Sequence, residues 1–366
     1  MVIITVRKPS LILTFSLSIL TLFLHGVAGE DDNSSHDFIN INNITGMHQV
    51  GQMSVRPNTN EIGVINYGDF EVWDVPNEKR TSSLFRIGNL FSLAWGPAGD
   101  RIALLEDNST YPSSNILIYN YTNDSFSLYK QIDVYLRLQS VHWSNSGKLL
   151  AVGSDNGTIL IYSTGAWEVS HNFQLSLEKT VNVLSISHND RYLIANCGSN
   201  LYIYNITSHE LVLHNRGFSP SSIDWSFNGT YVAIGEDSQE SIIYEFLPND
   251  TAWEVMRFPD ADCLCWRSSS DVIYFGQKET GHIYSVDIGK EVVELKARSA
   301  SDGHLTFDWL DDVGMLITAG SDSIVRSWLD LSLAPERPFA RIEMGAIPSP
   351  VSGRVEINGT ATGHPP

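Results

Sequence analysis

Cysteine is scarce in this sequence, which has three in 366 residues. Their spacing does not match that of a structural zinc site, whose ligands come in closely spaced pairs. Cys263 and Cys265 are two residues apart in an expected strand, so they point to the same side and a disulfide between them would strain the backbone. We therefore expect Cys197, Cys263 and Cys265 to be small buried apolar residues in a fold that does not depend on disulfides.

Positive charge is also scarce, because 23 lysines and arginines are set against 42 aspartates and glutamates, a formal net charge of −19. The first 29 residues hold two of these bases, Arg7 and Lys8, and no acid, so a chain beginning at Glu30 has 21 bases and a charge of −21. Such a surface repels phosphate backbones and anionic lipid headgroups. The composition argues against nucleic acid as a partner, keeps the protein soluble and favours basic partners or cations.

Only one long apolar run occurs, at residues 11–24. It follows the basic pair Arg7-Lys8 and precedes Val27-Ala-Gly29, small residues typical of a signal-peptide cleavage site. The run is short for a bilayer span, which takes about 20 residues. Residues 1–29 are therefore predicted to be a cleaved signal peptide, with an uncleaved anchor as the alternative. In both cases the body of the protein enters the secretory pathway lumen, and cleavage leaves it without stable membrane insertion.

Catalytic motifs are missing. The sequence has no His-Glu-x-x-His, no Gly-x-Ser-x-Gly, no phosphate-binding glycine-rich loop and no calcium-binding hand loop. We therefore predict no cofactor and favour a function that does not depend on catalysis.

Asparagine, by contrast, often begins an Asn-x-Ser/Thr glycosylation sequon. The chain has 25 asparagines, and about four sequons are expected from its composition by chance. Turns collect Asn, Ser and Thr for conformational reasons, which can raise the count without any glycan. Together with the signal peptide, however, the excess predicts glycosylation. The ten sequons begin at Asn33, Asn43, Asn108, Asn120, Asn123, Asn156, Asn205, Asn228, Asn249 and Asn358.

A repeated pattern organises most of the chain. Residues 138–163, LQSVHWSNSGKLLAVGSDNGTILIYS, contain three short apolar strands separated by turns, and Asp155-Asn-Gly157 is a strong hairpin signal. Six other windows align with this one when each is anchored at the end of its first strand, with spacings of 40, 48, 43, 39, 41 and 43 residues. This is the period of a four-stranded propeller blade. The anchors are Val55, Trp95, Trp143, Ile186, Trp225, Trp266 and Trp309.

The third strand of every window ends on an aromatic residue, which can pack between neighbouring blades. The long spacing in the second window comes from an insertion, residues 107–114, between its second and third strands. The seven aromatics are Trp73, Tyr119, Tyr162, Tyr204, Tyr244, Tyr284 and Trp328.

Residues 36–345 resemble the WD-repeat β-propeller family. Trp73-Asp74 is a literal Trp-Asp pair, and Gly320-Ser-Asp322 with Trp328 is similar to the family's Asp-to-Trp spacing. Well-placed Gly-His pairs before the first strands are absent, so no specific subfamily is indicated. The resemblance implies an all-β fold, a seven-bladed propeller of four-stranded antiparallel blades. Residues 91–173 also resemble the repeats of spindle-pole WD-repeat proteins.

The signal peptide, the repeats and the composition of the tail divide the chain into four parts. Residues 1–29 are the signal peptide, 30–46 contribute a strand that closes the ring, 47–344 form the propeller and 345–366 are a Pro-, Gly- and Ser-rich tail. The closing strand is predicted at residues 38–42, where apolar and polar residues alternate. Residues 338–344 are the alternative, and an unpaired edge there or elsewhere would invite aggregation.

The position directly before each anchor is a candidate functional site. The residues before the anchors lie at one level on the innermost strands, and His142, Asp224 and Asp308 are among them. They could converge near the axis as a cation site or an acid–base pair. The alternative is that they form hydrogen bonds between blades.

Two classes of function follow. The first is a secreted or lumenal glycosylated scaffold, a monomeric propeller that binds other proteins through its loops. The second is a propeller enzyme of the hydrolase or quinone-dependent dehydrogenase type, with its site in the central channel. A cytosolic protein of the spindle-pole type is a third, weaker alternative. Few acids or histidines occupy the equivalent inner positions, which favours the scaffold.

Overall fold

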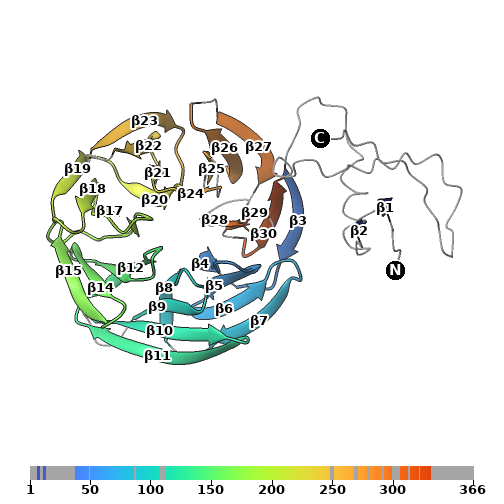
Figure 1. Cartoon of the computed structure of the whole chain (residues 1–366), viewed down its shortest axis with the longest axis horizontal. Coiled ribbons are helices and arrows are strands. Elements are labelled where there is room, and N and C mark those ends of the chain that lie inside the picture. Colours follow the sequence, from blue (N-terminus) through green and yellow to red (C-terminus); the bar gives the residue numbers. More distant parts are fainter. Residues whose placement is uncertain are drawn as a thin grey trace, which may run out of the picture. The chain divides into compact units, whose positions relative to one another are not determined.

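A computed structural model describes residues 6–8, 11–13, 38–48, 50–85, 88–107, 113–247, 251–267, 271–277, 280–289, 292–298, 306–311, 314–320 and 322–330. The chain divides into two units, residues 38–329 and residues 1–37 with 330–366. In the first unit, seven four-stranded antiparallel sheets stand around a ring (Figure 1), which confirms the predicted seven-bladed propeller. In the second, β1 (Val6–Lys8) pairs with β2 (Leu11–Leu13).

The first six blades run from an innermost to an outermost strand in chain order, and the seventh takes its outermost strand, β3, from the N-terminal segment. The first four blades contain β4 (Val50–Val55), β5 (Glu61–Asn66), β6 (Asp69–Asp74), β7 (Lys79–Leu84); β8 (Asn89–Trp95), β9 (Arg101–Asp107), β10 (Ser114–Thr122), β11 (Ser125–Val134); β12 (Leu138–Trp143), β13 (Leu149–Ser154), β14 (Thr158–Ser163), β15 (Glu168–Gln174); and β16 (Leu184–Ile186), β17 (Tyr192–Asn196), β18 (Asn200–Asn205), β19 (Leu211–Arg216).

The other three blades contain β20 (Pro220–Trp225), β21 (Tyr231–Glu236), β22 (Ser241–Phe246), β23 (Ala252–Phe258); β24 (Cys263–Trp266), β25 (Val272–Gly276), β26 (His282–Asp287), β27 (Val292–Arg298); and β28 (Thr306–Leu310), β29 (Met315–Ala319), β30 (Val325–Asp330) with β3 (Phe38–Ile44). The strand β3 lies beside β30, so the N-terminal segment supplies the fourth strand of the last blade. Residues 338–344 lie outside the described part of the chain.

The tight turns after the anchors follow from their residues. In the third blade, the Ser144 N–H donates to Leu149 O, and the Ser144 hydroxyl accepts the Leu149 N–H. Gly147 has a φ of 73°, a left-handed conformation that glycine adopts without steric cost. The turn therefore reverses the chain within four residues and joins β12 to β13.

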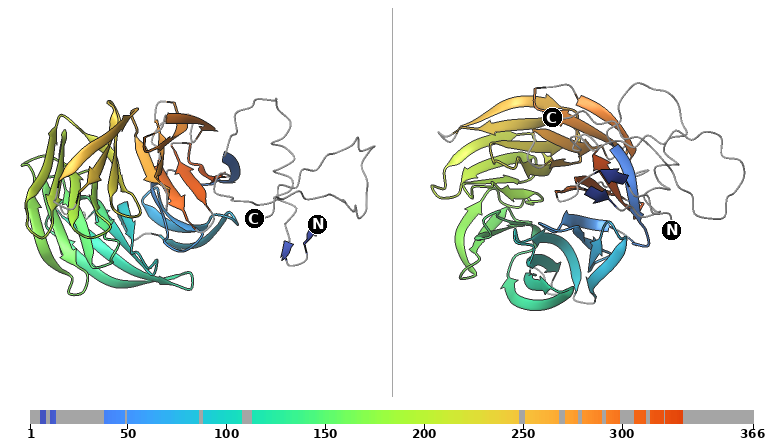
Figure 2. Two further views of the ribbon diagram at one scale, coloured as in Figure 1. Left: turned by 45° about the horizontal axis from the view of Figure 1, so that its top comes forward. Right: turned by 45° about the vertical axis from the view of Figure 1, so that its right-hand side comes forward.

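The core lies between adjacent blades, which Figure 2 shows stacked around the ring. Trp95 of the second blade meets Phe70 of the first edge-on at 6.1 Å between ring centroids, and it also contacts Tyr121. All three side chains are buried in one cluster. Trp95 and Phe70 thus join two adjacent sheets, and Tyr119, one of the aromatics predicted to pack between blades, is buried in the same cluster.

A β-bulge that the sequence did not predict recurs on the outermost strands. In the first five blades the pairing of the third and fourth strands shifts just before the aromatic that ends the third strand. The extra residue bends the outer strand and increases its twist. In two blades this residue is Thr81 or Ser170, whose hydroxyl donates to the carbonyl of Val72 or Ile161, respectively.

Cys197, Cys263 and Cys265 are buried and unpaired, as predicted. Apart from β1 and β2, the predicted signal peptide lies outside the described residues, as do the tail and most of the insertion at 107–114. No helix in the described part of the chain is long and apolar enough to cross a membrane.

Candidate functional site

One position recurs in three blades, directly before the anchor of the innermost strand. It is occupied by His142 in β12, Asp224 in β20 and Asp308 in β28. Each side chain accepts the backbone N–H of the anchor residue in the following blade. The three residues that the repeat singled out therefore link successive blades on the inner side of the ring.

Asp308 links the last blade to the first. Its Oδ2 accepts the Val55 N–H at 2.6 Å and the Ser54 hydroxyl at 3.3 Å. Its Oδ1 accepts the N–H of its neighbour Trp309 at 2.8 Å. Both carboxyl oxygens are thus occupied by donors of the protein itself.

Asp224 makes the same connection between the fifth and sixth blades. Its Oδ2 accepts the Trp266 N–H at 2.7 Å, and its Oδ1 accepts the Trp225 N–H at 2.9 Å. The indole Nε1–H of Trp266 donates back to the Asp224 carbonyl at 2.9 Å. The anchor tryptophan is therefore fixed through both its backbone and its side chain.

His142 makes the connection between the third and fourth blades, and this determines its tautomer. The Ile186 N–H donates to Nδ1 at 3.2 Å, so the proton of the neutral ring lies on Nε2. Nε2 is 3.3 Å from the Ser185 hydroxyl oxygen, to which it donates. A histidine that donates to a serine cannot take its proton, so this pair does not form an activated nucleophile.

Burial shifts the pKa of all three groups toward the neutral form. It raises the pKa of Asp224 to about 7, with a further increase from Asp308. It raises the pKa of Asp308 to about 6, against the N–H donors of Val55 and Trp309 that stabilise the carboxylate. Burial, and then the proximity of His188, lowers the pKa of His142 to about 4.

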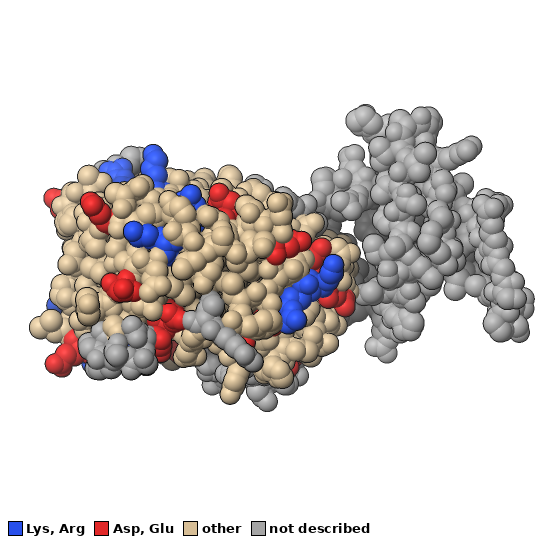
Figure 3. Space-filling view, turned by 90° about the horizontal axis from the view of Figure 1, so that it is seen from below, with Lys and Arg blue, Asp and Glu red and all other residues tan. Residues whose placement is uncertain are grey.

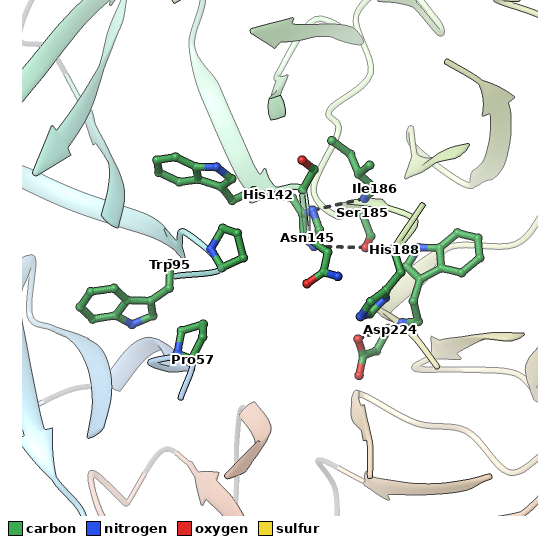
Figure 4. Close-up of a pocket in the computed structure, with 12 residues that line it drawn as sticks. Pro57, Trp95, His142, Asn145, Ser185, Ile186, His188 and Asp224 are labelled. Atoms are coloured by element: carbon green, nitrogen blue, oxygen red, sulfur yellow. Dashed lines mark hydrogen bonds between the residues drawn. The ribbon is translucent and has the colours of Figure 1, made fainter. Parts of the chain in front are cut away.

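His142 and Asp224 line one hollow at the mouth of the channel, with a volume of about 190 Å³, and Asp308 is not among its lining residues. Figure 4 shows the side chains of Asn145, His188 and Asp224 around this hollow. Among the described residues, no group of three His, Cys, Asp or Glu side chains could hold a metal ion. The geometry of His142, Asp224 and Asp308 is that of inter-blade hydrogen bonds, the alternative that the sequence left open.

Sequence reasoning missed a second set of lining residues. Pro57, Pro97, Asn145 and His188 each lie two positions after an anchor, in a turn between a first and a second strand. Phe227 has the same position in the fifth blade, and its ring lies 6.0 Å from that of His188. Counting two residues beyond each anchor in the repeat could have found them.

The opposite face is built from different loops. We call it the crossover face: the loops that join second to third strands and those that join one blade to the next, as at residues 67–68, 85, 88, 135–137 and 175–183. Four large apolar side chains in these loops are exposed. We call them the apolar loop surface: Tyr67, Phe85, Tyr135 and Leu177, with exposed fractions of 78%, 48%, 88% and 77%.

The rim of the propeller has mixed charge. Figure 3 shows Lys and Arg side chains of the described residues in small separate groups among acids on one side of the molecule. This side presents no continuous basic area on those residues, and such an area is what binding to a nucleic-acid backbone requires.

Six of the ten sequons lie in the described part of the chain. Asn43, Asn123, Asn156 and Asn228 are exposed, Asn120 is partly buried and Asn205 is buried. The other four, Asn33, Asn108, Asn249 and Asn358, lie outside the described residues.

Comparisons with known proteins support the fold. The family model of the anaphase-promoting complex subunit 4 WD40 domain matches residues 126–228. The ribosome assembly protein SQT1 of Saccharomyces cerevisiae is 33% identical over 93 residues, which are 24% of this chain and 21% of the length of SQT1. The matched segment is thus about a fifth of that relative.

A solved structure agrees over a longer range. The β-propeller domain of Cps50 (Swd1) from Myceliophteria thermophila superposes with a TM-score of 0.65 over 80% of this chain and 99% of that domain, at 9% sequence identity. At this identity the likeness concerns the fold alone. Together, the family match, the WD-repeat relative and the blade architecture support a divergent WD-repeat β-propeller, the family that the sequence resembles.

Proposed function

We propose that this chain is a glycosylated propeller of the secretory pathway, secreted or lumenal, that binds other proteins through its crossover face. WD-repeat propellers typically bind other proteins, and the loops of a rigid scaffold suit this role. The location rests on the sequence: a basic pair, an apolar run at 11–24 and a small-residue cleavage site, followed by ten sequons.

The apolar loop surface is the observation on which the binding role rests. Its four side chains come from three consecutive blades, and the loops that hold them emerge on one face. Tyr135 is 88% exposed and Leu177 is 77% exposed, so each has most of its apolar area in water. A partner that covers them gains about 25 cal/mol for each Å² removed from water.

The charge of the chain indicates the chemistry of the partner. At a formal net charge of −19, the protein attracts a partner whose apolar contact residues are flanked by lysine or arginine. Within the loops of the apolar loop surface, Glu178 is offset by its neighbour Lys179 and by Arg137, so the attraction depends on the net charge of the whole chain. We therefore expect binding to weaken as the salt concentration rises.

The roles in the relatives' names do not extend to this chain. SQT1 is a ribosome assembly protein, but the matched segment is 21% of its length. The family match begins at residue 126, so it covers neither residues 1–29 nor the apolar loop residues Tyr67 and Phe85. The partner is thus a question for experiment.

The test is cross-linking of the full-length protein in cells, followed by mass spectrometry. We expect a partner that is recovered with the wild type and is lost from a Tyr135→Asp/Leu177→Asp variant. The control is Trp253→Asp, at an aromatic position 63% exposed on the outermost strand β23, which should retain the partner. Equal recovery with both variants would refute the assignment of the face, and digestion of the protein by protease added outside intact microsomes would refute the lumenal location.

A further inference from the structure

The sequons differ in whether the folded chain leaves room for a glycan. This difference separates asparagines that can be glycosylated from those that cannot. N-glycans are bulky and attach to the side-chain nitrogen of asparagine, so they require that Nδ2 faces solvent. Modification of any asparagine depends on the proposed lumenal location, and the structure goes further by distinguishing which asparagines can carry a glycan.

Asn156 and Asn228 hold their amides in the same way. The Oδ1 of Asn228 accepts the Ser226 hydroxyl at 2.8 Å and the Thr230 N–H at 2.9 Å. The Oδ1 of Asn156 accepts the Ser154 hydroxyl at 2.7 Å, and it accepts the N–H and hydroxyl of Thr158 at 3.2 and 2.8 Å. With Oδ1 held inside the turn and the residue exposed, Nδ2 is directed away from the turn.

Asn123 lies at the tip of the β10–β11 hairpin. Thr122 pairs with Ser125, so Asn123 and Asp124 form a two-residue turn, and their φ angles of 51° and 55° are both left-handed. This is the type I′ geometry that asparagine adopts readily. Asn123, Asp124 and Ser125 are all exposed, so the whole sequon stands clear of the blade.

Asn43 is exposed on β3, the outermost strand of the last blade. Its Oδ1 accepts the Asn40 amide at 3.2 Å. A glycan on its Nδ2 therefore leaves the edge of the propeller without displacing a neighbouring blade.

Asn205 has the same kind of Oδ1 contacts but no room. Its Oδ1 accepts the N–H groups of Thr207 and Ser208 at 3.0 and 3.1 Å, and its own N–H donates to Glu210 O at 2.9 Å. The residue is 7% exposed. Its side chain shapes the turn between β18 and β19, and a glycan there would have to open that turn.

We propose that the four exposed sequons, at Asn43, Asn123, Asn156 and Asn228, accept glycans, and that Asn205 is unmodified because its amide holds the β18–β19 turn.

The test begins with the unaltered full-length protein expressed through a secretory host. Purified protein is treated with an N-glycosidase in ¹⁸O water, which converts each glycosylated Asn to a labelled Asp, and its peptides are mapped by mass spectrometry. We expect the label at Asn43, Asn123, Asn156 and Asn228 and an unlabelled Asn205. A labelled Asn205, or an unlabelled Asn228 beside other labelled sites, overturns the inference while the lumenal location stands. A chain without any glycan overturns both.

Two variants separate the sequon from the side chain that it contains. Thr207→Ala destroys the Asn205 sequon but keeps both donors to its Oδ1, because these are backbone N–H groups. Thr230→Ala does the same at Asn228, whose backbone donor also remains. We expect the mass of the secreted protein to fall by one glycan in Thr230→Ala and to show no glycan loss in Thr207→Ala. The loss of a glycan from Thr207→Ala would refute the structural role of Asn205.

Discussion

The carboxylate of Asp308, in the innermost strand of the seventh blade, accepts the backbone N–H of Val55 in the first blade at 2.6 Å. The two residues are 253 positions apart in the chain. They belong to the two blades that must meet for the ring to close, so this bond closes the ring on its inner side. On the outer side, β3 closes it by pairing with β30.

Replacement of Asp308 should therefore weaken the contact that closes the ring and destabilise the fold. Asp308→Ala leaves the Val55 N–H without its acceptor, and an unsatisfied buried donor costs about 1–3 kcal/mol. We expect the free energy of unfolding to fall by about that amount in urea titrations. Ser54→Ala, which removes a longer contact of 3.3 Å to the same carboxylate, serves as the control and should cost less. A larger loss for Ser54→Ala would show that the carboxylate does not act mainly through the backbone.

The stability should depend on pH through Asp224. Burial raises the pKa of its carboxyl to about 7 from an ordinary value of 3.8, so the folded state binds more protons than the unfolded state between those values. The resulting stabilisation is complete below about pH 4 and is lost as the pH rises through 7, by at most about 1.4 kcal/mol per pH unit. Asp308, with a pKa of about 6, adds to this trend.

His142 acts in the opposite direction, because its pKa of about 4 lies below its ordinary value of 6.5. Its contribution is present above pH 6.5 and is lost as the pH falls toward 4. The clean measurement is therefore the difference in unfolding free energy between the wild type and Asp224→Asn. We expect the advantage of the wild type to shrink from pH 4 to pH 7. An advantage that grows over this range would mean that the folded protein stabilises the ionised carboxylate.

The anchor positions should dominate the stability of the blades. Trp225 is 3% exposed and packs against Tyr192 and Phe246, so Trp225→Ala should cost about 3–5 kcal/mol. Phe227, two residues later and 63% exposed, is a matched control whose replacement by Ala should cost less than about 1 kcal/mol. Similar losses measured by thermal unfolding at both positions would contradict the packing of this blade.

Deletion of residues 30–44 should destabilise the propeller sharply. The deletion removes β3, and the edge of β30 then lacks a partner and can pair with another molecule. We expect a lower melting temperature and concentration-dependent aggregation in light scattering. Deletion of residues 345–366 is the control and should change neither. Full retention of the melting temperature after the N-terminal deletion would mean that another segment can replace β3.

The sequence predicted the blades because each depends on local signals. An anchor, a turn such as Ser144–Gly147 and an aromatic at the end of the third strand recur in every window, and their spacing determines the number of blades. The choice of residues 38–42 as the closing strand also followed from a local pattern, the alternation of apolar and polar residues. The confirmed fold is thus the part that short-range periodicity can specify.

The environment of His142, Asp224 and Asp308 could not be predicted in the same way. The repeat placed all three at one level, but two arrangements satisfy that position: a shared site on the axis and separate bonds to the next blade. The choice depends on side-chain direction and on the distance to the next anchor N–H, and neither is encoded within one window. The bulges opposite Tyr119 and Tyr162 could not be predicted for the same reason, since a bulge is a property of two paired strands.

The affinity of the apolar loop surface for its partner tests the proposed binding role most directly. Once cross-linking has identified that partner, its Kd should be measured by calorimetry for the wild type, Leu177→Asp and Trp253→Asp. A charge in place of a buried apolar contact should weaken binding at least about tenfold for Leu177→Asp, while Trp253→Asp should bind like the wild type. Wild-type affinity in Leu177→Asp together with a loss in Trp253→Asp would place the binding site on the rim and contradict the central claim.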